Sequence, residues 1–159
     1  MAASNATSSS PEQLGVTVLR VSLGVMWVAH ALLKLLVFTL PGTAQYFASI
    51  GFPSFLAYPV FAAEMLGGLA LLLGFYARQA ALALIPVMGV AAWVHWPNGW
   101  VHTSAGGGWE YPVFLVAASL ALWLLGDGAA TIKRSQWLAP RIATRPRVQG
   151  VLRAEGVAK

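Results

Sequence analysis

The chain has 159 residues, of which 58% are hydrophobic and only 9% are charged, whereas an average soluble domain carries about 25% charged residues. This composition excludes an ordinary soluble domain and indicates an integral membrane protein of one domain. The absence of cysteine excludes disulfides, thiolate catalysis and cysteine-ligated clusters. The formal charge of +5 is concentrated in the C-terminal tail, which favours an anionic lipid surface over nucleic acid as a partner.

The first apolar stretch follows a polar N-terminal segment. Residues 1–13 are rich in Ser and Ala and are predicted to be disordered, and residues 14–38 form the first predicted membrane span. Arg20, His30 and Lys34 fall on one face of this helix. Because cations are costly against lipid, we expect this face to point into a helix bundle.

The second predicted span carries a carboxylate near its middle. Residues 39–53 are uncharged and are predicted to lie at the membrane interface, and residues 54–75 form the span. Glu64 lies far inside the apolar run, where a carboxylate normally faces a partner or a polar cavity. Gly67 and Gly68 follow one turn later, and small residues at this spacing allow a neighbouring helix to approach closely.

The other two predicted spans each carry one ionisable residue near the same side of the membrane. Residues 80–96 form the third span, with His95 at its end. Residues 110–125 form the fourth span and begin with Glu110, a position where the helix dipole favours negative charge. Residues 129–159 are a basic tail that is predicted to be cytoplasmic.

The distribution of Lys and Arg predicts the orientation. Arg78, between the second and third spans, and the basic tail lie on one side, while the loops after the first and third spans contain neither Lys nor Arg. By the positive-inside rule, both termini are cytoplasmic. The predicted fold is an all-α integral membrane protein, an antiparallel bundle of four transmembrane helices over residues 14–128.

Ionisable residues from all the predicted spans lie at a similar depth in the membrane. At a rise of ~1.5 Å per residue they lie ~15–25 Å above the cytoplasmic edge, in the outer half of a hydrocarbon core about 30 Å thick. Such a cluster usually marks a ligand or proton pathway. We therefore take Glu64 and Lys34 as candidate catalytic residues, and His30, His95 and Glu110 as candidate ligand-binding residues. A metal site is not expected, because a lysine is mixed among the ligands.

Each of these residues also has a structural interpretation. Lys34 and Glu64 can form an ion pair that only holds two helices in register. Glu110 can be a helix-start residue, and His95 can be an interfacial histidine among tryptophans.

Structural interpretations are favoured for three other polar residues. Arg20 is predicted to snorkel to the inner membrane edge, Arg78 to set the topology, and His102 to be a plain loop residue. Two histidines in a helix bundle also suggest a further alternative, the binding of haem by two histidine ligands. This is disfavoured because His30 and His95 differ in estimated height.

The order and spacing of these residues resemble the DoxX family of small bacterial membrane proteins. The resemblance is carried by Arg20-x3-Gly24-x5-His30-x3-Lys34, by Glu64-x2-Gly67-Gly68-x5-Gly74-x3-Arg78, and by Glu110 ahead of Gly126-Asp127-Gly128. It extends from Leu14 to Ile132. It implies a four-span bundle in the bacterial inner membrane and a role as an oxidoreductase subunit linked to quinone.

Two functions of different classes follow from these observations. In the first, the protein is a redox subunit in which Lys34 or His30 hydrogen-bonds a quinone carbonyl, and Glu64, Glu110 or His95 transfers the accompanying proton. In the second, it is a non-catalytic membrane anchor or assembly partner for other proteins. The absence of cysteine and of any cofactor motif favours the second function for this chain alone, whereas the buried polar layer favours the first. In the first, a redox partner protein is expected beside this chain.

Overall fold

The computed structural model describes residues 9–136, and this part of the chain is helical without a β-strand. The predictions for residues 1–8 and for the tail beyond residue 136 lie outside the described residues. The α-helices are α1 (Pro11–Leu32), α2 (Leu40–Ser49), α3 (Ala57–Leu73), α4 (Ala77–His95) and α5 (Glu110–Leu125). A π-helix at Leu33–Val37 continues α1, and short 3-10 helices occupy Ser54–Leu56 and Trp96–Asn98.

Three of the helical stretches are long and apolar enough to cross a membrane. They are Pro11–Val37, Ser54–Leu73 and Ala77–Asn98. The remaining long helix, α5, is apolar but has 16 residues, which corresponds to about 24 Å. The prediction of an all-α protein with membrane helices is confirmed, and the bundle of four spans stays a prediction.

The observed helix starts differ from the predicted ones at two places. Helix α1 begins at Pro11, ahead of the predicted start at 14, because the Ser10 hydroxyl accepts a hydrogen bond from the Gln13 N–H and proline suits the first helical turn. Helix α4 begins at Ala77, ahead of the predicted start at 80. Periodicity alone does not reveal these starts, since they depend on the Ser10 cap in α1 and on local backbone geometry at Tyr76 before α4.

Glycines bring α1 and α3 into close contact. A Cβ atom on Gly68 would lie 2.9 Å from the Val28 nitrogen, and one on Gly24 would lie 2.9 Å from the Leu72 nitrogen. Only glycine fits at such a distance from a neighbouring backbone. The predicted close approach at Gly68 is therefore confirmed, and it holds the two helices that carry Lys34 and Glu64 side by side.

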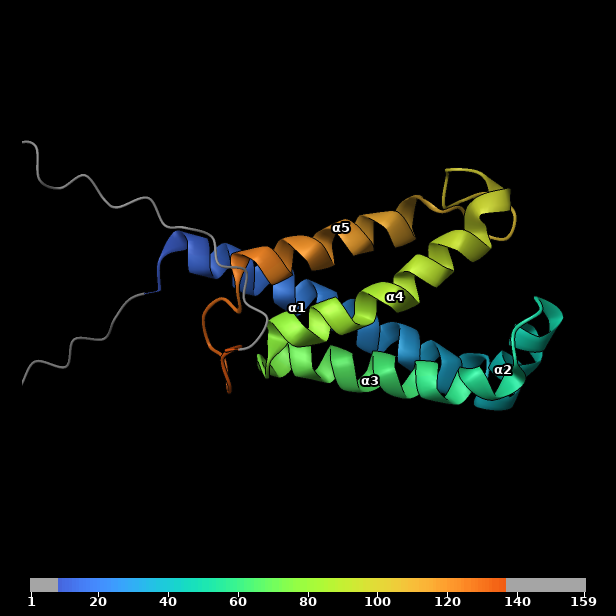
Figure 1. Ribbon diagram of the computed structural model, residues 1–159, viewed down its shortest axis with the longest axis horizontal. Helices are drawn as coiled ribbons and strands as arrows, with labels where there is room; N and C mark the ends of the chain where they lie inside the picture. Colours follow the sequence, from blue (N-terminus) through green and yellow to red (C-terminus); the bar gives the residue numbers. More distant parts are fainter. Residues whose placement is uncertain (1–8, 137–159) are drawn as a thin grey trace, which may run out of the picture.

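The four long helices run alongside one another, and the two ends of the molecule differ (Figure 1). One end carries α2 and the loop over residues 99–109. The other end carries the start of α1, the turn between α3 and α4, and the segment 126–136. A core of fully buried side chains lies between the helices and includes Trp27, Leu71, Leu84 and Leu122.

Arg20 is buried in this second end and does not snorkel, so its predicted role is wrong. Its side chain is 1% exposed, and its guanidinium donates hydrogen bonds to the carbonyls of Leu71 at 3.0 Å and Ala129 at 3.0 Å. The last carbonyls of a helix have no intrahelical partner. Arg20 satisfies those at the end of α3 and joins them to the segment after α5.

Asp127 fixes the same segment to the start of α4. Its carboxylate accepts hydrogen bonds from the Ser135 N–H at 2.7 Å, the Ser135 hydroxyl at 2.6 Å and the Arg78 N–H at 3.2 Å. The Tyr76 N–H also donates to the Lys133 carbonyl at 2.9 Å. Residues 129–136, which the sequence assigned to the tail, are therefore packed against the turn between α3 and α4.

Candidate functional site

A cavity of about 580 Å³ opens at the end of the molecule that carries α2. This volume is within the range of about 300–1,000 Å³ that is typical of small-molecule sites. All five α-helices and the loop over residues 99–109 contribute to its wall. The wall is mostly apolar and aromatic, and its carboxylate, ammonium and imidazole side chains are Glu64, Lys34, His30, His95 and His102.

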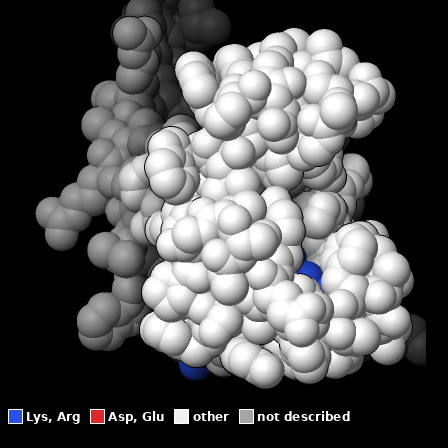
Figure 2. Space-filling model, turned by 90° about the vertical axis from the view of Figure 1, so that its right-hand side faces the viewer, with Lys and Arg blue, Asp and Glu red and all other residues white. Residues whose placement is uncertain are grey.

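The structure thus brings together four of the five residues that were predicted to lie at a similar depth in the membrane. His30, Lys34, Glu64 and His95 line the cavity, whereas Glu110 does not. The surface at this end is almost free of charged groups, and cationic atoms are visible at the bottom of a hollow (Figure 2).

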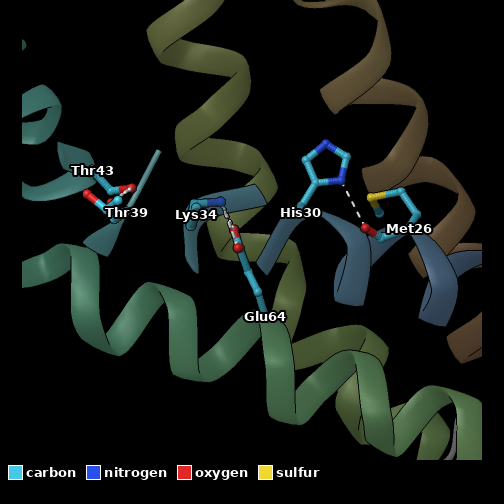
Figure 3. Close-up of polar contacts among 6 residues, drawn as sticks. All are labelled: Met26, His30, Lys34, Thr39, Thr43 and Glu64. Carbon is cyan, nitrogen blue, oxygen red and sulfur yellow. Dashed lines mark hydrogen bonds and ion pairs between the residues drawn. The ribbon is translucent and has the colours of Figure 1, made fainter. Parts of the chain in front are cut away.

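Lys34 and Glu64 form an ion pair in the wall of the cavity (Figure 3). The Lys34 ammonium donates to Glu64 Oε2 at 2.7 Å and to Oε1 at 2.9 Å. The side chain of Glu64 is 3% exposed and that of Lys34 is 18% exposed. An ammonium group has three N–H donors, so this geometry leaves Lys34 one donor for a ligand.

Lys34 lies in the π-helix that ends the first helical segment. The Phe38 N–H donates to the Leu33 carbonyl at 2.9 Å, five residues back, and π-turns of this kind are frequent at functional sites. The next residue, Thr39, has φ of 61°, an uncommon value for a β-branched residue. Its hydroxyl accepts from the Gly42 N–H at 3.2 Å and caps α2. This turn directs the chain into the helix that covers the cavity.

Two of the three histidines that line the cavity, His30 and His95, are each oriented through Nδ1 by a backbone carbonyl. His30 Nδ1 donates to the Met26 carbonyl at 2.9 Å, and its ring stacks on Tyr111 with centroids 6.3 Å apart. His95 Nδ1 donates to the Gly106 carbonyl at 3.0 Å. A carbonyl can only accept, so a neutral imidazole in this position keeps Nε2 as an acceptor. Both histidines can therefore accept a proton or a hydrogen bond at Nε2.

Glu110 pairs with His102. Glu110 Oε1 accepts hydrogen bonds from the His102 backbone N–H at 2.9 Å and from His102 Nδ1 at 2.6 Å. His102 also lines the cavity, so its interpretation as a plain loop residue is wrong. No sequence signal places His102 there, because the pairing depends on the fold of the loop. Within residues 9–136, no group of three or more His, Cys, Asp or Glu is arranged to hold a metal ion.

A protein-family model matches about half of this chain. The DoxX family model matches residues 15–96, which are 82 of the 159 residues. The chain belongs to the DoxX family. The match includes His30, Lys34, Glu64 and His95, and it ends before Glu110.

A curated relative of this DoxX protein carries an enzymatic name. It is the "Putative oxidoreductase CatD" of Bacillus subtilis (strain 168), which is 39% identical over 66 residues. The alignment covers 42% of this chain and 48% of the relative, so the chain spans about half of that protein. No solved structure matches the chain.

Proposed function

We propose that this DoxX protein is the membrane subunit of a quinone-linked oxidoreductase and that the cavity holds the quinone head group. The observation that carries the proposal is the Lys34–Glu64 pair in the wall of a mostly apolar cavity of about 580 Å³. An apolar pocket with a few convergent polar groups is the usual form of a small-molecule site. The name of the CatD relative adds support for redox chemistry.

Lys34 is the residue best placed to hold a quinone carbonyl. Two of its N–H groups are directed to Glu64, and the third is available to the ligand. Reduction places negative charge on the carbonyl oxygen, and a fixed cation stabilises that charge most strongly in a site that excludes water. Glu64 keeps the ammonium in place. His30 and His95 can exchange the protons that accompany reduction, through Nε2.

The electrons come from a partner protein in this proposal. Reduction of a quinone to a quinol takes up two electrons and two protons. The sequence has no cysteine, and residues 9–136 provide no metal-ligand cluster. The chain therefore supplies binding, orientation and proton transfer, and a redox partner supplies the electrons.

The proposed setting is the bacterial inner membrane, with four antiparallel spans and both termini in the cytoplasm. It is supported by the basic residues at the end that carries Arg78 and by the absence of Lys and Arg from the loop over residues 99–109. Because the chain has no cysteine, a single Ser104→Cys or Arg134→Cys substitution gives a unique label. An impermeant thiol reagent should reach Ser104→Cys from outside and Arg134→Cys only after lysis. Labelling of both from one side would overturn the topology.

Quinone binding to the purified protein tests the proposed function. Ring quinones added to protein in nanodiscs should quench tryptophan fluorescence saturably, because several tryptophans lie near the cavity end, including Trp93 and Trp96. Lys34→Met should abolish the saturable part. Lys133→Met is the matched control, since Lys133 is exposed and its backbone pairs with Tyr76 at the other end of the molecule. A folded wild-type protein that binds no quinone would favour the membrane anchor over the redox subunit.

A further inference from the structure

A second cavity, of about 390 Å³, lies between α1 and α5. Its lining residues recur every three or four positions along both helices, so each helix contributes one continuous stripe. They are Gly15, Val18, Leu19, Ser22, Leu23 and Met26 of α1, and Tyr111, Phe114, Leu115 and Ala118 of α5. We call this cavity the α1–α5 groove.

The α1–α5 groove adjoins the main cavity. Tyr111 and Leu115 line both of them. Met26 lines the groove, and its carbonyl accepts the hydrogen bond from His30, which lines the main cavity. The ring of His30 stacks on Tyr111. The two cavities therefore meet at Tyr111 and Leu115, whose side chains can change rotamer without unfolding a helix.

The groove has room along its length. Helix α1 packs much more closely against α3 than against α5. At the far end of the groove, a Cβ atom on Gly15 would have nothing within 4 Å. From Gly15 to Met26 the groove extends about 16 Å along α1. Its lining is apolar apart from the hydroxyls of Ser22 and Tyr111, and such a lining suits a hydrocarbon chain.

We propose that the α1–α5 groove holds the hydrocarbon tail of a membrane-borne quinone whose head group lies in the main cavity. The inference rests on the proposed function and specifies its substrate class as a lipid-soluble quinone with a long apolar tail. The groove adds little affinity, because lipid is as apolar as the groove lining. Its role is steric: the head group reaches Lys34 only when the tail has a way out toward the bilayer.

Two quinones with the same ring test this inference. Menadione has no tail, and menaquinone-4 carries an isoprenoid tail. Ser22→Phe places a ring in the groove, away from the residues of the main cavity. It should weaken menaquinone-4 binding by about tenfold or more, which corresponds to about 1.4 kcal/mol. It should leave menadione binding unchanged within about twofold. Val25→Phe is the control, because Val25 is exposed on α1 and lines neither cavity.

Two further substitutions complete the test. One is at the far end of the groove, and the other is on α4, where the tail would leave the main cavity by a different route. Gly15→Leu fills the open space at the far end of the groove and should weaken the binding of menaquinone-4 but not that of menadione. It provides the test if Ser22→Phe does not fold. Val90 is an exposed residue that lines the main cavity on α4. If Val90→Phe selectively excludes menaquinone-4 and neither groove variant does, the tail leaves past α4 and the inference is wrong. Equal losses for both quinones in the groove variants would also overturn it. A wild-type protein that binds neither quinone refutes the proposed function itself.

Discussion

The Lys34–Glu64 pair allows a stability test in which each single substitution should cost much more stability than the double substitution. Lys34→Met removes the counter-ion of a carboxylate whose side chain is 3% exposed. In soluble proteins, removal of one partner of a buried pair costs about 3–5 kcal/mol, because the other charge is left uncompensated. We expect a loss of this size for Lys34→Met and again for Glu64→Leu.

The double variant Lys34→Met/Glu64→Leu should recover most of that stability. It removes both charges and leaves only apolar side chains in an apolar wall, and such replacements are often neutral or stabilising. The coupling energy between the two sites should therefore reach several kcal/mol, far above the ~0.5 kcal/mol error of additivity for independent sites. Lys133→Met, at an exposed position, should change stability by less than about 0.5 kcal/mol.

The assay is reversible unfolding in mixed micelles, followed by circular dichroism, together with quinone binding by the same variants. Additive single substitutions would refute the energetic reasoning. Quinone binding then distinguishes a structural role of the Lys34–Glu64 pair from a functional one. A stable double variant that has lost quinone binding supports the proposed site, whereas a stable double variant that binds normally shows that the pair only joins the helices. Glu64→Gln, which keeps the shape but does not carry the negative charge, should stay folded and lose the redox phenotype.

Three further changes test other contacts. Gly68→Val should destabilise the bundle by about 1–3 kcal/mol, since its Cβ would lie 2.9 Å from the Val28 nitrogen, and unfolding in micelles measures the loss. Asp127→Ala should release the segment that it holds through Ser135, which faster hydrogen exchange there would show; unchanged protection would contradict the role of Asp127. Truncation after Gln136 should leave helix content unchanged by circular dichroism, because the described contacts involve residues up to that point; loss of helicity would show that the removed residues support the fold.

The buried ion pair could be predicted because intramembrane charges are severely restricted. A carboxylate in the middle of an apolar run needs a partner, and Lys34 is on the preceding helix at nearly the same estimated height. Gly67 and Gly68 could be interpreted in the same way, since small residues one turn from the carboxylate indicate the face of a close helix contact. These inferences use only helical spacing and the cost of burying charge.

Other contacts depend on loop geometry that no periodicity reveals. Arg20 finds its acceptors at the end of α3 and in the segment after α5, which are brought together only by the tertiary fold. His102 meets Glu110 because the loop over residues 99–109 returns its backbone to the start of α5. The π-turn that carries Lys34 likewise leaves no pattern in the sequence.

The two cations of the first helical segment, Arg20 and Lys34, differ in their hydrogen-bond partners, and this difference supports the placement of the site. Both Arg20 and Lys34 come from one helix face that the sequence predicted to point inward. The terminal nitrogens of Arg20 donate to four backbone carbonyls, at 3.0–3.4 Å, so both of these nitrogens are used within the fold. Lys34 directs its hydrogen bonds to a single carboxylate, keeps 18% of its side chain exposed and lines the large cavity. A cation that joins helix ends needs many fixed acceptors, whereas a cation that holds a ligand must keep a donor free. That difference assigns Arg20 to the fold and Lys34 to the proposed site.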